Sequence, residues 1–398
     1  MRLEYQVLAA VALDLALGDP RWLPHPVRGI GWLAARLESL VRPAGSPLPP
    51  GAAPTTMLRT VPGYSGVRVG LAPRVPYGPP HPNPLPKGEG KIWTRLLGLL
   101  VALTVYAAAG LAAWGAIWAA GLVHPAAGDA VAVLVIYVAI APRDLARHSM
   151  AVYRALAGGD VVEARRRVAA IVGRDTANLD PAGVVRAAVE TVAESTVDGV
   201  TAPLLFAVVV GPVGSIVYRA INTLDSMFGH QDPHYRDFGW AAARIDDLAN
   251  YLPARLTAPL LCVAAGLLGQ RPLRAIRVLV RDGRNHPSPN AGLVEAAVAG
   301  ALGVQLGGRN LYDGLPLDRP TLGDPLVPLA TRHIPAANAL MFTTAALLLA
   351  IMLPLRAVAE GPVVRCPLSV VSCPLQLTTD HGPCILHPSA LILDPLHD

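Results

Sequence analysis

The sequence predicts an all-α fold: a multi-pass bundle of transmembrane helices with interfacial cytoplasmic helices and a disordered insertion rich in proline and glycine. Apolar residues make up 53% of the 398 residues and charged residues only 15%, which is more apolar surface than one soluble core needs. Residues 96–123 and 336–355 are apolar runs, each long enough to cross a hydrocarbon layer about 30 Å thick at about 1.5 Å per helical residue. The sequence therefore predicts a membrane protein.

The shorter apolar segments predict further helices. Residues 7–17 contain Asp14 and have neither a cationic leader nor a small-residue cleavage site, so they predict a retained helix packed inside the bundle. Residues 131–141 follow the sequence HPAAGD closely and are expected to form the return arm of a helical hairpin. Residues 256–268 predict another span.

One apolar segment is interrupted. Residues 200–217 contain two prolines and two glycines, at Pro203, Gly211, Pro212 and Gly214, and predict a broken or re-entrant helix. The preceding residues 143–199 are too charged to span and predict cytoplasmic or interfacial helices. One of these covers residues 181–196 and begins at Asp180-Pro181, a pair that suits an N-cap followed by proline at the first helical position.

Composition divides the chain into five parts. These are a first helix with the GDP and HPVR motifs (1–42), a low-complexity insertion (43–92), a membrane core expected to hold the site (93–335), a last transmembrane helix (336–356) and a poorly ordered tail (357–398).

The basic residues limit the chemistry. Apart from Lys87 and Lys91, every one is arginine, so a Schiff-base lysine and a phosphate-loop lysine are not expected. Arginine binds carboxylate and phosphate groups through bidentate hydrogen bonds, so these arginines are suited to binding anions. The arginine-rich segments before residue 96 and after residue 141 are expected on the cytoplasmic side. Basic residues are not interleaved with aromatic ones, so nucleic-acid binding is not expected.

The first polar patch is residues 219–255, which hold five aspartates, four arginines and two histidines between apolar segments. Polar groups kept beside a membrane usually serve a site. Asn222 and Asp225 lie one helical turn apart, and Arg244, Asp247 and Asn250 recur at three-residue steps, so each set can share a helix face. Such hard oxygen ligands suit magnesium. For any single residue, a helix cap or loop hydrogen bond is the alternative.

A second patch precedes it. Arg186, Glu190 and Glu194 recur at four-residue intervals and Asp198 follows, so one helix face presents an arginine and then carboxylates. A solvated face is the alternative. The patch leads directly into the apolar segment from residue 200, which places Glu194 and Asp198 beside the membrane.

A third patch begins with five arginines between residues 271 and 284. They predict a cationic helix face, for which lipid anchoring is the alternative to a role in the site. In the sequence NHPSPNAG, Asn290 is expected to cap a helix that begins near Ala291. Because a helix start offers backbone amides to an anion, His286, Ser288 and Asn290 are candidate phosphate or carboxylate contacts.

Several motifs together resemble one family. They are GDPRWLPHPVRGIG from residue 18, AESTVDGVTAPL, YRAINTLDSMFGH, YRDFGWAAARIDDLANYLPARLTA and HPSPNAGLVEAAVAGALGVQLGG. These resemble the integral-membrane adenosylcobinamide-phosphate synthase family of cobalamin biosynthesis, also called CobD/CbiB. The resemblance covers most of residues 3–310 and departs from the family at residues 43–92 and in the tail.

The resemblance implies an amide-forming ligase of the inner (cytoplasmic) membrane, with its site facing the cytoplasm. Adenosylcobyric acid would be joined through its f propionate to (R)-1-amino-2-propanol or the O-phosphate of that amine, with ATP as co-substrate and Mg²⁺ as cofactor. The lipid bilayer is the expected partner, and assembly into homo-oligomers is left open. An isoprenoid-diphosphate transferase and a corrinoid transporter remain the alternatives.

The expected roles divide the candidate residues into three sets. The catalytic candidates are Glu194, Asp198, Asp225 and Asp247, and the metal candidates are Asp225, Asp246 and Asp247. The substrate-binding candidates are Asp19, His25, Arg28, Arg219, Asn222, Arg244, Asn250, Arg255, His286, Ser288 and Asn290. This hypothesis requires the three patches to converge at one hollow.

Overall fold

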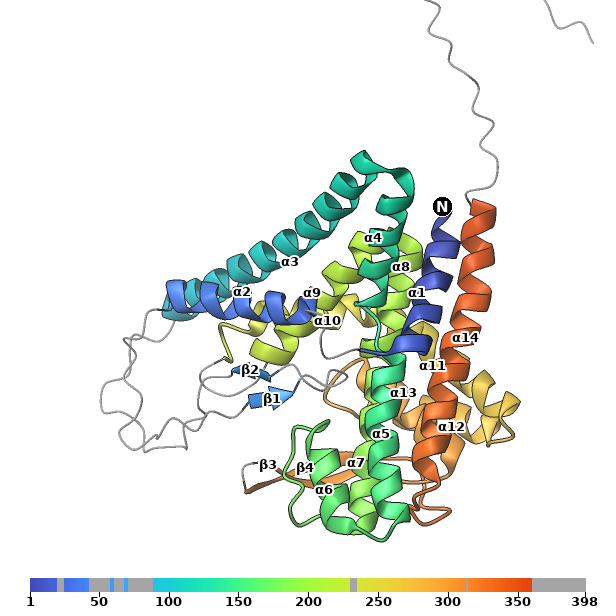
Figure 1. The fold of residues 1–398 in the computed structure, drawn as a ribbon. Helices are drawn as coiled ribbons and strands as arrows, with labels where there is room; N and C mark the ends of the chain where they lie inside the picture. Colours follow the sequence, from blue (N-terminus) through green and yellow to red (C-terminus); the bar gives the residue numbers. More distant parts are fainter. Residues whose placement is uncertain are drawn as a thin grey trace, which may run out of the picture. The chain divides into compact units, whose positions relative to one another are not determined.

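The computed structural model describes residues 1–19, 25–42, 58–60, 68–70, 89–229, 235–312 and 314–359. Met1–Ala359 forms one compact unit, and this unit is a helical bundle (Figure 1). The tail and most of the 43–92 insertion, for which disorder was predicted, lie outside the described residues.

Two single helices and two composite runs have the length and hydropathy needed to cross a membrane. The single helices are α3 (Glu89–Val123) and α14 (His333–Ala359). The first composite run joins α4 (Pro125–Tyr137) to α5 (Pro142–Ala157), and the second joins α7 (Pro181–Ser195), the π-helical turn η1 (Thr196–Thr201) and α8 (Ala202–Val210). The chain is therefore a multi-pass transmembrane helical bundle, as the sequence predicts.

The hairpin and the broken segment also follow the predictions. Helix α3 turns into α4 at His124, whose Nδ1 accepts a hydrogen bond from the Ala126 amide at 3.1 Å. Helix α8 ends at Gly211, where φ is 97°, and α9 (Pro212–Phe228) begins at the next residue. Glycine adopts this left-handed backbone without strain, and the following proline cannot continue the α8 hydrogen-bond ladder.

The prediction that residues 143–199 lie wholly outside the spans is wrong. Residues from Pro181 onward continue through η1 into α8 and form one apolar run of 30 residues, Pro181–Val210. Two charged side chains of α7, Arg186 and Glu190, are bonded to the backbone of a neighbouring strand, whereas Glu194 is exposed. The predicted start of α7 is confirmed, since the Asp180 side chain accepts from the Gly183 amide at 2.7 Å.

The first helix is packed inside the bundle, as predicted. Helix α1 (Leu3–Leu17) contacts α4 and α8, and its Val7 and Ala10 are fully buried. Asp14 Oδ2 accepts from the Arg143 amide at 3.1 Å and so caps the first turn of α5. The end of α1 is thereby fixed at the junction of α4 and α5.

The remaining helices surround this core. They are α2 (Pro26–Val41), α6 (Val161–Ala169), α10 (Trp240–Ala249), α11 (Tyr251–Leu267), α12 (Pro272–Asp282) and α13 (Ala291–Leu302). Helix α11 corresponds to the segment 256–268 that was predicted to span the membrane, but it is one of the shorter apolar helices and is not among the four runs long enough to cross. The sequence did not predict the two antiparallel strand pairs. These are β1 (Leu58–Thr60) with β2 (Arg68–Gly70), and β3 (Leu306–Tyr312) with β4 (Leu315–Leu322).

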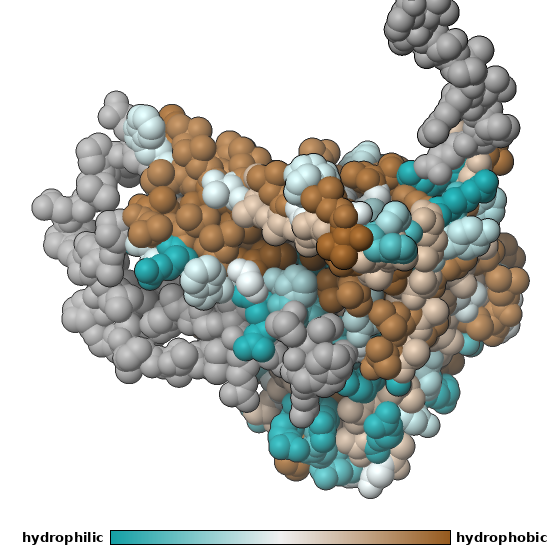
Figure 2. All heavy atoms as spheres, turned by 45° about the horizontal axis from the view of Figure 1, so that its top comes forward, coloured by the Kyte–Doolittle hydropathy of each residue, from teal (hydrophilic) through white to brown (hydrophobic). Residues whose placement is uncertain are grey.

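The surface separates into an apolar part and a polar part (Figure 2). Apolar side chains gather over α3, which exposes Leu100, Leu111, Trp114 and Trp118. Hydrophilic side chains gather where α5 and α6 lie, at the lower end of the view. An exposed apolar helix next to a polar base is the pattern expected of a bundle that is partly inserted in a bilayer.

Candidate functional site

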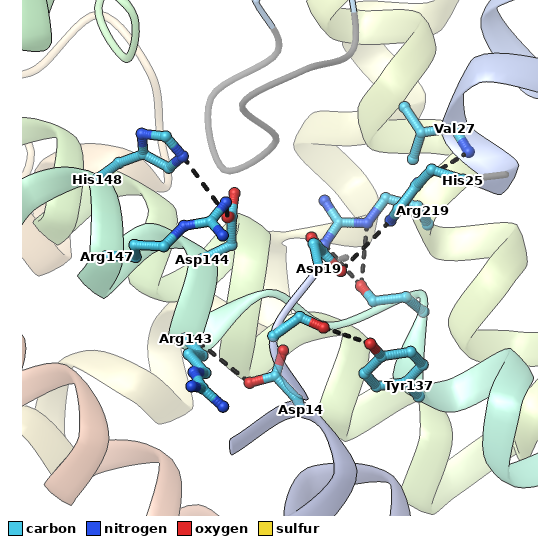
Figure 3. Close-up of polar contacts among 12 residues, drawn as sticks. Asp14, Asp19, His25, Val27, Tyr137, Arg143, Asp144, Arg147, His148 and Arg219 are labelled. Carbon is cyan, nitrogen blue, oxygen red and sulfur yellow. Dashed lines mark hydrogen bonds and ion pairs between the residues drawn. The ribbon is translucent and has the colours of Figure 1, made fainter. Parts of the chain in front are cut away.

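Arg219 of α9 lies at the centre of the polar interior. Its side chain is buried and donates from Nε at 3.0 Å and from Nη2 at 2.6 Å to the carbonyl oxygen of Ala139 (Figure 3). It also donates from Nη1 to Asn222 Oδ1 at 3.3 Å. Ala139 lies in the turn between α4 and α5, where a broken helix leaves backbone groups without helical partners. Arg219 therefore ties α9 to this break.

Asp19 and His25 of the first sequence motif face Arg219 (Figure 3). His25 Nε2 lies 3.9 Å from Asp19 Oδ1. Burial raises the pKa of Asp19 to about 7. Burial, aided by the Arg219 charge, lowers the pKa of His25 to about 3, so His25 is neutral at neutral pH while Asp19 titrates there.

Five acidic side chains from four elements form what we call the carboxylate cluster: Glu194 of α7, Asp198 of η1, Asp225 of α9, and Asp246 and Asp247 of α10. Burial raises the pKa of Asp225 to about 7, with further contributions from Asp247 and Glu194. Burial also raises the pKa of Asp246 well above its usual range, and Asp225 and Asp198 add to this. Carboxylates distant in sequence therefore share one electrostatic environment.

Arg219 also acts on this cluster electrostatically. The charges of Arg219 and Glu194 act on Asp198, which is hydrogen-bonded to Asn222, and Asp198 sits on a π-helical turn, a rare geometry that is frequent at functional sites. Burial raises the pKa of the less deeply buried Asp247, while the neighbouring Arg244 opposes the rise. Arg219 thus connects the carboxylate cluster to Asp19 and His25.

A chain of hydrogen bonds orients Asp246. Tyr218 OH donates to Asn250 Oδ1 at 2.7 Å, and Asn250 Nδ2 donates to Asp246 Oδ2 at 3.0 Å. Two glycines bring α10 close to its neighbours. A Cβ on Gly98 of α3 would lie 1.9 Å from the Phe238 carbonyl oxygen, and one on Gly239 would lie 1.7 Å from that of Phe228. Only glycine permits this approach at either position.

One buried carboxylate oxygen of the cluster is suited to a hard cation such as magnesium. Asp246 Oδ1 is buried and has no hydrogen-bond partner among the described residues, which leaves a hard oxygen available to a cation. Within the same residues, no three His, Cys, Asp or Glu side chains are grouped as a metal site. Magnesium is commonly held by one or two carboxylates together with substrate phosphates.

The third patch is joined to the carboxylate cluster through Asn290. Its Nδ2 donates to the Asp247 carbonyl at 2.8 Å, and its Oδ1 accepts from Arg255 Nη1 at 3.1 Å. The predicted side-chain cap by Asn290 is wrong, because Ser288 Oγ accepts from the Ala291 amide instead, at 3.2 Å. Burial lowers the pKa of His286, whose Nε2 lies 3.8 Å from Glu295 Oε1.

Other predicted residues lie at the edge or elsewhere. Arg244 is largely exposed and pairs with Asp247 at 3.3 Å. Arg28 is exposed on α2. The predicted cationic face on α12 is partly neutralised, since Arg281 pairs with Asp282 and Asp324. The two loop histidines, His230 and His234, lie outside the described residues.

Some polar residues of the interior were missed by the sequence analysis. Asp144 of α5 has a side chain only 1% exposed and pairs with Arg147 and His148 (Figure 3). Glu295 of α13 is buried near Glu194. Glu190, which the second patch includes but the candidate site residues do not, pairs with Arg174. The spacing of Asp144 and His148, one helical turn apart, is a signal in the sequence for their pairing.

Comparison with known proteins agrees with this architecture. A family model described as CobD/Cbib protein matches residues 83–341. The cobalamin biosynthesis protein CobD of Geobacter metallireducens is 48% identical over 81% of this chain and 87% of its own length. CobD of Leptospira interrogans is 38% identical over 87% and 95%, and CbiB of Salmonella typhimurium is 39% identical over 88% and 97%. No solved structure matches. The chain belongs to the CobD/CbiB family of cobalamin biosynthesis proteins.

Proposed function

We propose that the protein is an ATP-dependent ligase that joins adenosylcobyric acid to (R)-1-amino-2-propanol or its O-phosphate. The product is adenosylcobinamide or its phosphate. The observation that carries the proposal is that Arg219 connects the carboxylate cluster to Asp19 and His25, so that residues from five family motifs surround one polar interior.

Amide formation in water needs an activated carboxylate. The f propionate oxygen attacks the γ-phosphorus of ATP and ADP leaves. The amine nitrogen then attacks the acyl carbon, inorganic phosphate leaves, and one proton is lost from nitrogen. Each step moves negative charge onto phosphate oxygens, and fixed cations stabilise that charge most where water is excluded.

The residues take distinct roles in this scheme. Asp246, with Asp225 and Asp247, would hold Mg²⁺, which neutralises phosphate charge when bound. Arg244 and Arg255 flank the cluster and bind phosphate or carboxylate groups. Glu194 or Asp198 accepts the proton released by the amine. The proposal places the reaction at the cytoplasmic face of the inner membrane, because arginines flank both ends of the α3–α4 hairpin.

The test is conversion by the purified protein in lipid nanodiscs. Adenosylcobyric acid, the amine with or without phosphate, ATP and Mg²⁺ are supplied, and the corrinoid product is identified by mass spectrometry. We expect the mass of the amide, loss of activity on chelation, and recovery with added Mg²⁺. Asp246→Asn should abolish conversion, whereas Asp318→Asn, at an exposed aspartate of β4, should not.

The alternatives give different results. An unchanged corrinoid that crosses the membrane of sealed vesicles would favour a transporter. A product that carries a prenyl chain from an added isoprenoid diphosphate would favour the transferase. Either result, without amide formation, contradicts the proposal.

A further inference from the structure

A polar hollow lies beside Asp19 and is not used by the scheme above. We call it the α5 cavity. It has a volume of about 330 Å³ and lies between the end of α1 and the helices α5 and α6. Its polar lining is Asp19, Arg147, His148, Arg154 and Arg167. Three arginines therefore face one carboxylate, so the lining carries an excess of positive charge.

That excess is only partly cancelled by the residues behind the lining. Arg147 is paired with the buried Asp144. Arg167 shares Glu163 with Arg166, so two guanidinium groups are served by one carboxylate. Arg154 is exposed and makes no ion pair within the described ranges. A guanidinium group that lacks a full carboxylate partner binds phosphate oxygens well, because its N–H groups match their geometry.

The cavity also has unmet polar atoms at its inner end. Both carboxylate oxygens of Asp19 are buried without a hydrogen bond in the described part of the chain, and His25 Nε2 lies 3.9 Å from Oδ1. His148 Nε2 also makes no hydrogen bond there and lies 3.5 Å from Asp144 Oδ1. Buried polar atoms are normally satisfied, so such atoms at a cavity wall indicate a missing ligand or water. Asp19 faces the cavity and Arg219 alike (Figure 3), and it therefore lies between this cavity and the carboxylate cluster.

We propose that the α5 cavity binds a small phosphate monoester, with the phosphate on Arg147, Arg154 and Arg167 and a hydrogen-bond donor of the same ligand on Asp19. The volume lies at the low end of ligand pockets, which favours a small ester over a nucleotide or a corrinoid. The proposal rests on the proposed function only for the choice of physiological ligand, the O-phosphate of the amine. Its amino group would then be held at Asp19, on the side of Arg219.

The test is calorimetric titration of the full chain in nanodiscs of phosphatidylcholine, without ATP or corrinoid. The probes are inorganic phosphate, aminopropanol O-phosphate, aminopropanol and ATP. We expect the O-phosphate to bind more tightly than the other three. Arg154→Gln and Arg167→Gln should each weaken its binding by roughly tenfold, as for loss of a hydrogen bond to a charged group. Asp19→Asn should weaken binding of the O-phosphate but not of inorganic phosphate.

Arg166→Gln is the matched control. Arg166 lies on the same helix and pairs with the same Glu163, but it does not line the cavity. Replacement of Arg166 should leave binding unchanged. Gel filtration of each variant, with the charge-conserving variant Arg154→Lys included, shows whether a loss of binding is due to misfolding. Equal effects of the control and the cavity variants would overturn the proposal. Tighter binding of ATP than of the O-phosphate would also overturn it. The same holds if the cavity variants change binding only when the protein is in vesicles of phosphatidylglycerol.

Failure of this inference can be told apart from failure of the proposed function. If conversion proceeds and the cavity variants leave the KM for the O-phosphate unchanged, the cavity assignment is wrong and the ligase stands. If binding follows the arginines but no amide forms, the cavity assignment stands and the ligase does not.

Discussion

The carboxylate of Asp225 lies over Gly229 at the end of α9: a Cβ on Gly229 would be 2.0 Å from Asp225 Oδ1 and 2.7 Å from the Asp225 carbonyl oxygen. The backbone of Gly229 has φ of −68°, which any residue can adopt, so the glycine is required only for space. The position of a candidate metal ligand thus depends on the absence of one methyl group.

Gly229→Ala is therefore expected to displace the Asp225 carboxylate without unfolding the protein. A misplacement of about 1 Å near the reacting groups can lower the rate on the order of 100-fold. The measurement is kcat/KM for amide formation together with the thermal midpoint. Gly115→Ala on α3, where nothing lies within 4 Å of the added Cβ, is the control. Full activity of Gly229→Ala would show that this placement of Asp225 is not needed.

Tyr218→Phe tests the hydrogen-bond chain that orients Asp246. The substitution leaves Asn250 Oδ1 buried without its donor, which should destabilise the fold by about 1–3 kcal/mol. It should also lower kcat/KM, because Asn250 is then free to rotate away from Asp246. Tyr5→Phe, at an exposed tyrosine of α1, should change neither quantity. An active Tyr218→Phe protein of lowered stability would indicate that the chain serves folding alone.

Stability should depend on pH through Asp19. Its pKa is about 7 in the folded protein against an ordinary 3.8, so between these values the folded state keeps a proton that the unfolded chain has released. The free energy of unfolding therefore falls as pH rises through this interval, by at most about 1.4 kcal/mol per pH unit for one group. Thermal midpoints across the interval should decline less steeply in Asp19→Asn than in the unchanged protein. Equal slopes would contradict the shift.

Local signals made much of the fold predictable from sequence. Long apolar runs identify α3 and α14, and Asp180-Pro181 identifies the start of α7, because each depends only on neighbouring residues. The four-residue spacing of Glu194 and Asp198 assumes a regular α-helix. The π-helical turn at Thr196–Thr201 departs from that geometry, yet Asp198 still lies close enough to Glu194 for the two charges to interact.

The interior of the site depends on contacts distant in sequence. Arg219 meets the carbonyl of Ala139, and Asn290 meets that of Asp247 instead of capping its own helix. Such partners are backbone groups exposed by a broken helix or a loop, and no side-chain pattern reveals them. The sequence could indicate which residue types gather near the membrane, but not that Asp144 joins them or that Glu190 pairs with Arg174.

Two ion pairs at the β3–β4 hairpin allow a comparison of buried and exposed charge. Glu190 accepts from the Gly307 amide at 2.7 Å and pairs with Arg174, whose side chain is 6% exposed. Arg309 and Asp318 pair across the hairpin with side chains 73% and 69% exposed. Glu190→Ala leaves the Arg174 charge buried without its carboxylate partner, and should lower the free energy of unfolding by about 3–5 kcal/mol. Asp318→Ala should cost less than about 1 kcal/mol, since solvent screens the exposed pair.

The two variants are compared by thermal unfolding and by limited proteolysis of the hairpin. We expect early cleavage near β3 in Glu190→Ala only, because Glu190 and Arg186 fix that strand to α7. Glu190→Gln keeps an acceptor for the Gly307 amide while removing the charge, and should fall between the other two. If Glu190→Gln is as stable as the unchanged protein, the hydrogen bond to Gly307 holds the hairpin and the Arg174 pair adds nothing to it.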